Sequence, residues 1–365
     1  MKILLIGEYS NVHNTLAQGL RALGHKVCVI SNGDFWKNYP RDIDVARRPG
    51  KLGGILLLMR LWTLLPKMRG YDVVQLINPI FFELRAERLY FFYRYLRKHN
   101  KSVFLGAFGM DWYWVHTCTN EKPLRYSDFN FGDKVREDAI AKKDQHDWLG
   151  TVKEQLNKMI ATDCDGIITG LFEYQACYHP KFPDKTQFIP YPISTWATDI
   201  TTHDKLRIFV GISKERSAYK GTDIMLRAAE DLVKKYPTKV DIIKAEGVPF
   251  AEYQHMMDNS DVQLDQLYAY TPAMNALLAM SKGIIVVGGG EPENYEILGE
   301  TELRPIVNVL PNYESVYHEL EQLILHPERI PVLKRQSIEY VRRHHDYIKV
   351  ARQYEAFYKE KSRNA

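Results

Sequence analysis

The feature that most constrains this fold is an alternation of short apolar runs with helical segments, which occurs twice along the chain. Residues 2–7 (KILLIG) and 27–31 (VCVIS) are apolar runs, and the segment between them, 15–26, carries apolar residues at helical spacing. A strand, a helix and a second strand in this order build parallel sheets. The alternation begins again at residues 206–213. The sequence therefore predicts two consecutive α/β domains.

Further strands are expected in both halves, with a polar linker at residues 194–205 between them. In the first half the expected strands are 71–77, 102–108, 166–170 and 187–192. In the second half we expect strands at 206–213, 240–245, 261–266 and 283–290 and helices at 221–237, 249–260 and 271–283. The predicted domains are 1–195 and 204–340, followed by a helix at 341–365 that packs back on the first domain.

Length and composition fit this prediction and exclude other classes. A chain of 365 residues is long enough for two domains, and 45% hydrophobic with 26% charged residues excludes disordered and fibrous proteins. The net charge of +4 gives no reason to expect nucleic-acid binding. Residues 1–100, however, contain 16 Lys and Arg against 7 Asp and Glu. This asymmetry indicates either an anionic partner, such as a membrane surface or a phosphorylated ligand, or chance variation in surface charge.

Cysteine usage and hydropathy predict a cytoplasmic protein. The four cysteines form no CxxC pair, which argues against a disulfide framework or a zinc site and favours a reducing compartment. The apolar run at the N-terminus has about four residues, too few for a signal peptide. Residues 52–65 are leucine-rich, but Arg60 interrupts them and they fall short of the roughly 20 residues that a membrane span needs.

A candidate anion site follows the first strand of the second half. Arg216, Lys220 and Gly221 lie between that strand and a helix. Free backbone N–H groups at the start of the helix would point to the same place as the two cations, which suits a diphosphate. The alternative is a solvated basic loop.

A second feature is expected at the same edge of the sheet. Ala273, Met274 and Asn275 open a helix, and the glycines at 288–290 follow the next strand and precede Glu291. Both lie at the carboxyl ends of strands, where open α/β sheets bind ligands.

These motifs resemble a known family. The order of the glycine loop, the "KG-T-D" helix at 220–223, the strand ending at Asp265, the "A-L-x-A-M-x-x-G" helix and the "GG-x-P-E"-like turn is similar to the donor half of GT-B glycosyltransferases. The nearest group is the retaining family 4 enzymes. Residues 7–27 resemble their first loop and strand entry, and 188–193 (FIPYPI) resembles their hinge approach.

The resemblance implies a GT-B fold, in which two Rossmann-like domains face an interdomain cleft and a C-terminal helix crosses back. It implies a retaining, metal-independent hexosyltransferase that moves a sugar from a nucleotide diphosphate donor to a glycan, for example a lipid-linked one in cell-surface polysaccharide synthesis. No cofactor, metal or nucleic acid is expected. Arg216 and Lys220 would bind the diphosphate beside Gly221, and Asp265 would lie near the nucleotide. The backbone at Ala273, Met274 and Asn275 would hold the sugar and phosphate, and Glu291 would lie near the donor sugar.

The sequence departs from the family at two positions. The family carries two glutamates eight residues apart, and these positions read Tyr270 and Leu278 here. The usual ribose-binding carboxylate is therefore absent, which leaves the nucleotide and the retention of activity open. Glu291, Glu293 and Glu296 are candidates to replace it.

The first domain supplies candidates for the acceptor. Asp111 follows a strand end, and the family's similar loops lie near the acceptor, so Asp111 is expected at the acceptor hydroxyl, by hydrogen bond or as base. A helix-capping role is the alternative. His13 and Asn14 lie in the loop after the first strand and are expected to bind the acceptor, unless they only cap the next helix. His116 is a further candidate for an active-site histidine.

Two segments, 47–69 and 88–101, mix basic residues with leucines or aromatics. Such segments lie at membrane interfaces and would suit a lipid-linked acceptor at the inner face of the membrane. Ordinary helices that pack their leucines inward have the same composition.

Other enzyme classes have less support. A dinucleotide-binding oxidoreductase needs G-x-G-x-x-G after the first strand, and only Gly7 is present there. The sequence contains no Walker A, HExxH or GxSxG motif. A nucleotide-sugar epimerase of the same fold and a non-catalytic binding partner remain alternatives.

Overall fold

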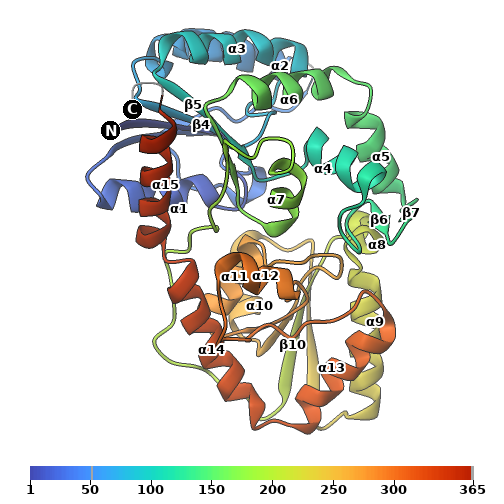
Figure 1. Cartoon of the computed structure of the whole chain (residues 1–365). Helices are drawn as coiled ribbons and strands as arrows, with labels where there is room; N and C mark the ends of the chain where they lie inside the picture. Colours follow the sequence, from blue (N-terminus) through green and yellow to red (C-terminus); the bar gives the residue numbers. More distant parts are fainter. Residues whose placement is uncertain (51, 363–365) are drawn as a thin grey trace. The chain divides into compact units, whose positions relative to one another are not determined.

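The structure, a computed structural model, describes residues 1–50 and 52–362 (Figure 1). These residues form two compact units. The first contains the chain up to Pro123, Lys143–Pro192 and the chain from Tyr347 onward, and the second contains Leu124–Lys142 and Ile193–Asp346. Each unit has one parallel sheet flanked by helices. The predicted pair of α/β domains is therefore confirmed.

The sheet of the first unit has the strand order β3-β2-β1-β4-β5-β8-β9, all parallel. The strands are β1 (Lys2–Ile6), β2 (Lys26–Ser31), β3 (Ile43–Asp44), β4 (Val73–Leu76), β5 (Ser102–Ala107), β8 (Gly166–Thr169) and β9 (Thr186–Phe188). β4, β5 and β8 are buried at every residue, because central strands of a parallel sheet are covered on both faces. Continuous apolar runs therefore predicted them well.

Helices connect these strands. They are α1 (Val12–Ala22), α2 (Gly53–Leu64), α3 (Ala86–His99), α4 (Trp112–His116), α6 (Val152–Asp163), α7 (Phe172–Tyr178) and α15 (Tyr347–Lys361). α15 packs on α1, and a Cβ at Gly19 would lie 2.3 Å from the carbonyl oxygen of Tyr347, so only glycine permits this approach. The C-terminal helix thus belongs to the first unit. Among the described residues, no helix has the length and apolar character of a membrane span.

The sheet of the second unit has the order β11-β10-β12-β13, also parallel. Its strands are β10 (Leu206–Ile212), β11 (Val240–Glu246), β12 (Val262–Leu264) and β13 (Ile285–Val287). Its helices are α8 (Ser217–Lys220), α9 (Thr222–Lys235), α10 (Phe250–Asp258), α11 (Met274–Ser281), α12 (Pro292–Leu298), α13 (Tyr313–Leu325) and α14 (Arg329–His344). One face of the sheet forms a core with α9 and α13 through residues such as Val210, Met225 and Leu320.

A buried ion pair holds the amino ends of this sheet. Lys334 on α14 donates to Asp261 at 2.6 Å, and both side chains are almost inaccessible. Asp261 also accepts from the backbone N–H of Arg207 at 3.0 Å, and Lys334 donates to the carbonyl of Thr201 at 2.5 Å. The polar linker predicted at 194–205 is therefore fixed to the second unit by these contacts.

The units differ from the expected domain boundaries. Residues 193–195 and 341–346 belong to the second unit, and the last helix begins at Tyr347 and not at residue 341. The largest difference concerns a segment in the first half of the sequence. Leu124–Lys142, which the prediction placed in a first domain of residues 1–195, belongs to the second unit. It contains a short antiparallel pair, β6 (Asn130–Phe131) with β7 (Lys134–Val135), and leads into α5 (Ala139–Trp148). The buried Asn130 side chain donates to the carbonyls of Leu124 and Gly132 and so fixes the hairpin. We call Leu124–Lys142 the inserted hairpin.

Candidate functional site

The candidate anion loop follows β10 at the carboxyl edge of the second sheet. A 3-10 turn (Lys214–Arg216) and α8 lead to Gly221, which has φ of 73° and precedes α9. A Cβ at Gly221 would lie 2.5 Å from Cβ of Leu267, in the loop after β12. The backbone N–H of Leu267 also donates to the carbonyl of Lys220 at 3.0 Å. Glycine at this position therefore lets the two loops touch.

This contact brings Lys220 and Gly221 close to the loop after β12, which contains Asp265. Arg216 is exposed, Lys220 is half-buried, and the charge of Lys220 acts on Asp265. Burial raises the pKa of the Asp265 carboxyl, and the Lys220 cation opposes that rise. Two cations thus lie four residues apart in a loop that ends at a helix N-terminus, which is an arrangement that attracts a polyanion.

The start of α11 lies at the same edge. Ala273 is its N-cap residue in an extended conformation, Met274 is buried, and the Asn275 amide donates to the Tyr253 hydroxyl at 3.0 Å. The predicted contact of these three residues with a donor stays a prediction. A Cβ at Gly289 would lie 3.2 Å from the carbonyl carbon of Thr271, so the glycine turn packs against the chain that enters α11. The structure therefore brings the start of α11 and the glycine turn at 288–290 together, as expected.

Glu291 has protein partners on both carboxylate oxygens. It accepts hydrogen bonds from the Tyr126 hydroxyl, from Arg125 at 2.7 Å and from Asn308 at 3.1 Å. Arg125 also pairs with Glu293 at 2.5 Å. Burial and the neighbouring Glu291 raise the pKa of Tyr126, which therefore stays protonated and donates. A role of Glu291 at the donor sugar stays a prediction, and it would require these partners to be exchanged.

The two positions that depart from the family have clear roles in packing. The Tyr270 hydroxyl accepts from the backbone N–H of Arg125 at 2.7 Å, and the Arg125 guanidinium lies 4.9 Å from the centre of the Tyr270 ring. Leu278 is half-buried on α11. Sequence reasoning missed Arg125 and its neighbour Tyr126 because more than 140 residues separate them from their partners and no local pattern marks them.

In the first unit, the predicted acceptor residues are enclosed. His13 is fully buried: its Nδ1 lies 2.8 Å from the carbonyl oxygen of Gly7 and its Nε2 lies 3.1 Å from the Gln75 amide. Burial lowers the pKa of His13 to about 3, so the ring is neutral. The Asn14 side chain donates to Asn11 at 2.8 Å. Contact of His13 and Asn14 with an acceptor therefore stays a prediction.

Sequence reasoning also missed Glu8, which caps the start of α1. Its carboxylate accepts from the backbone N–H groups of His13 at 3.2 Å and Asn14 at 2.8 Å. Burial raises the pKa of Glu8 to about 8, and these two hydrogen bonds act against that rise. Glu8 lies two residues after the end of β1, and a carboxylate at that position is the signal that could have found it.

Asp111 is the N-cap residue of α4. It is fully buried and accepts from the backbone N–H of Trp114 at 2.9 Å and from the Tyr178 hydroxyl at 2.7 Å. Burial raises the pKa of Asp111 to about 7. The capping alternative is therefore what the geometry shows, and contact with an acceptor stays a prediction. His116 stacks on Trp112, with 4.4 Å between the ring centres, and burial lowers its pKa.

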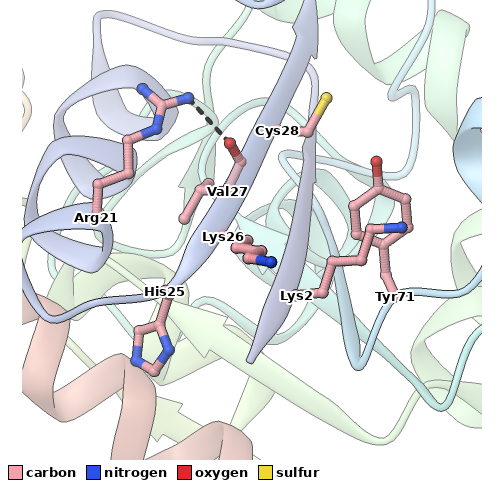
Figure 2. A pocket seen from close by; sticks show the side chains of 7 residues that line it. All are labelled: Lys2, Arg21, His25, Lys26, Val27, Cys28 and Tyr71. Atoms are coloured by element: carbon pink, nitrogen blue, oxygen red, sulfur yellow. Dashed lines mark hydrogen bonds between the residues drawn. The ribbon is translucent and has the colours of Figure 1, made fainter.

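A separate pocket of about 340 Å³ lies at the opposite, amino-terminal edge of the first sheet (Figure 2). Lys2, Arg21, His25 and Lys26 line it, together with Val27, Cys28 and Tyr71. Arg21 pairs with Asp42 at 2.7 Å, and His25 lies 3.3 Å from Glu355. The charge of Arg21 is therefore balanced by a carboxylate, and the predicted ligand residues all lie elsewhere. Among the described residues, no group of His, Cys, Asp or Glu is arranged to hold a metal ion.

Solved structures share this fold over nearly the whole chain. Sucrose-phosphate synthase from Thermosynechococcus elongatus aligns at 14% identity with a TM-score of 0.61, covering 99% of this chain and 98% of its own. HepE from Anabaena, in complex with UDP-glucose, aligns at 11% identity with a TM-score of 0.59, covering 99% and 100%. UDP-GlcNAc 2-epimerase from Neisseria meningitidis, bound to UDP-GlcNAc, aligns at 12% identity with a TM-score of 0.55, also covering 99% and 100%.

These likenesses show the GT-B fold, with a Rossmann-like unit in each half of the chain. A sucrose-phosphate synthase and a UDP-GlcNAc 2-epimerase thus both occur among the similar structures. No family model and no curated protein matches the sequence, so the retaining family 4 assignment stays a prediction.

Proposed function

We propose that the protein is a glycosyltransferase whose second unit binds a nucleoside diphosphate sugar. The observation that carries this proposal is the loop in which Arg216 and Lys220 precede Gly221 and the start of α9. Similar structures hold UDP or UDP-sugars, which fits a diphosphate ligand.

The proposed reaction needs no metal. The bond between the anomeric carbon and the diphosphate breaks, a bond to the acceptor oxygen forms, and the acceptor proton leaves with a base or with the departing phosphate. Arg216 and Lys220 would stabilise the negative charge that develops on the diphosphate. Retention of anomeric configuration is the outcome that the family resemblance implies.

Asp111 remains the proposed partner of the acceptor hydroxyl. A carboxyl group with a pKa of about 7 suits a general base at neutral pH. Because Asp111 is fully buried at the start of α4 and accepts a hydrogen bond from the Tyr178 hydroxyl, the acceptor would reach it only after α4 or Tyr178 has shifted.

The acceptor is proposed to be a glycan carried on a lipid. α2 and α3 carry exposed apolar side chains, and Trp62 of α2 stacks on Phe91 of α3 with 4.6 Å between ring centres. This face, which we call the α2–α3 face, comprises Leu52, Ile55, Leu56, Met59, Trp62 and Phe91. Arg60, Lys67 and Arg88 are exposed on the same elements or directly beside them. Apolar and basic groups together favour an anionic membrane surface.

Vesicle sedimentation tests this membrane contact. The protein should sediment with anionic vesicles and less with neutral ones, and added salt should weaken the binding. Trp62→Ser with Met59→Ser should reduce binding about tenfold, since each removes an apolar side chain from the interface. Val332→Ser on α14 of the second unit is the matched control, because Val332 is also half exposed. Equal sedimentation with neutral vesicles would reject the membrane contact.

A nucleotide-sugar epimerase is the second candidate, because several similar structures are UDP-GlcNAc 2-epimerases. A non-catalytic binding partner is the third, since Tyr270 and Leu278 stand where the family has glutamates. Incubation with labelled UDP-sugars, with and without a lipid extract from the source cells, separates the three. Label in the lipid fraction supports transfer, an epimerised nucleotide sugar indicates the epimerase, and binding without turnover indicates the third candidate.

A further inference from the structure

The inserted hairpin Leu124–Lys142 contacts the carboxyl edge of the second sheet at two places. At one end, Arg125 and Tyr126 bind Glu291 and Glu293, which follow β13. At the other end, Arg136 reaches the anion loop that follows β10. The hairpin comes from the first half of the sequence, so no motif in the second half predicts it.

Arg136 contacts the backbone between the two proposed diphosphate ligands. Its Nη2 donates to the carbonyls of Ala218 and Tyr219, both at 3.0 Å, and these residues lie between Arg216 and Lys220. The guanidinium also lies 3.8 Å from the centre of the Tyr268 ring in the loop after β12. A single side chain therefore joins the anion loop to the loop that Gly221 touches.

Other contacts hold the guanidinium in this position. Its Nη1 donates to the carbonyl of Ser127 at 3.2 Å, and Asp138 pairs with it at 3.2 Å. The side chain is 11% exposed. A planar guanidinium that several acceptors already hold loses little conformational entropy when it binds two carbonyls. It can therefore stabilise one conformation of a short turn.

The consequence for an anion follows from electrostatics. α8 is a single turn, and the carbonyls at its end carry negative partial charge that disfavours a polyanion nearby. Arg136 binds two of these carbonyls and so offsets their negative partial charge, while Asp138 balances the charge of the guanidinium itself. Arg136 thereby fixes the backbone between Arg216 and Lys220.

We propose that Arg136 is a positioning residue of the diphosphate site: through the carbonyls of Ala218 and Tyr219 it fixes the loop that presents Arg216 and Lys220 to a nucleoside diphosphate. This proposal rests on the proposed function of that loop. It assigns the inserted hairpin to the donor site, although the hairpin belongs to the first half of the sequence.

Titration calorimetry with UDP, GDP and ADP establishes which nucleoside diphosphate the wild-type chain binds, and Arg136→Gln is then titrated with that nucleotide. The variant should bind it about tenfold more weakly, which is about one hydrogen-bonded contact. The affinity of Arg136→Gln for inorganic pyrophosphate should fall to the same degree. The free nucleoside, followed by ligand-observed NMR, should bind both proteins equally, because it does not reach the anion loop.

Arg304→Gln is the matched control. Arg304 also belongs to the second unit, donates to two backbone carbonyls, of Glu300 and Leu303, and lies 4.2 Å from the centre of a tyrosine ring, Tyr295. It contacts no residue of the anion loop in any of these interactions, so its loss should leave nucleotide affinity within about twofold.

Arg136→Lys keeps the charge but cannot bind both carbonyls in the same plane, so it should weaken diphosphate binding severalfold. This variant still tests the proposal if Arg136→Gln does not fold. Unchanged affinity in a folded Arg136→Gln or in Arg136→Lys overturns the proposal. An equal loss for nucleotide and free nucleoside also overturns it, because that result indicates general damage. If the wild-type chain binds no nucleoside diphosphate, the proposed function itself fails.

Discussion

The carboxyl edges of the two sheets are built from the same strand–loop–helix units but leave different side chains accessible. In the first unit, Glu8, His13 and Asp111 follow strands, yet all are buried and bound to backbone or side-chain groups. In the second unit, Arg216 is exposed in a loop that Gly221 shapes. A polar residue after a strand therefore does not by itself indicate a ligand contact. The conformation of the loop that follows the strand determines whether the polar side chain is accessible to a ligand.

Asp111→Asn tests whether the buried edge of the first unit also takes part in chemistry. If Asp111 is the base, kcat should fall about a hundredfold or more, while nucleotide affinity stays unchanged. Asparagine can still cap α4, so the melting temperature should change little. An unchanged kcat in a steady-state transfer assay would leave Asp111 with the capping role alone.

Gly221→Ala tests the shape of the exposed loop. The new Cβ would meet Leu267 at 2.5 Å in a left-handed backbone conformation, so we expect a loss of about 2–3 kcal/mol in the free energy of unfolding together with weaker nucleotide binding. Gly24→Ala is the control, because Gly24 also has a positive φ but no atom lies within 4 Å of its Cβ position. It should lose only about 1 kcal/mol. Equal losses, measured by urea denaturation, would show that packing against Leu267 is unimportant.

Glu8→Gln tests the burial of the first edge through pH. The folded pKa of Glu8 is about 8, above its ordinary value of 4.5, so the folded state binds the proton more tightly than the unfolded state does. This stabilisation is complete below about pH 4.5 and is lost as pH rises toward 8. Relative to Glu8→Gln, the wild-type chain should therefore lose on the order of 4 kcal/mol in the free energy of unfolding across that range.

His13 has the opposite effect on the pH dependence of stability, because its lowered pKa destabilises the fold as pH falls from 6.5 toward 3. Since His13 is present in both proteins, its effect cancels in the comparison. Melting curves of wild-type and Glu8→Gln protein between pH 5 and 8.5 make the comparison. Parallel profiles would contradict the burial of an ionisable Glu8.

Sequence patterns predicted the sheets because buried parallel strands are continuous apolar runs, as in Ile3–Ile6 of β1 and in β13. They also predicted the loop around Gly221, because a glycine between two short elements is a local signal. They could not predict that Arg125 and Arg136 come from a distant hairpin, or that Tyr178 binds Asp111 across 67 residues of sequence. Contacts of this kind depend on the packing of the whole unit.

The most direct test asks whether Arg216 and Lys220 bind a nucleoside diphosphate. It is a calorimetric titration of a panel of nucleoside diphosphates into the wild-type chain and into the double variant Arg216→Ala, Lys220→Ala. Charge-assisted hydrogen bonds contribute about 1.5–3 kcal/mol each, so loss of both cations should weaken binding about a hundredfold or more. We predict that the wild-type chain binds at least one diphosphate and that the double variant shows no measurable binding. Equal binding by both proteins, or binding of no nucleotide by the wild-type chain, would contradict the account.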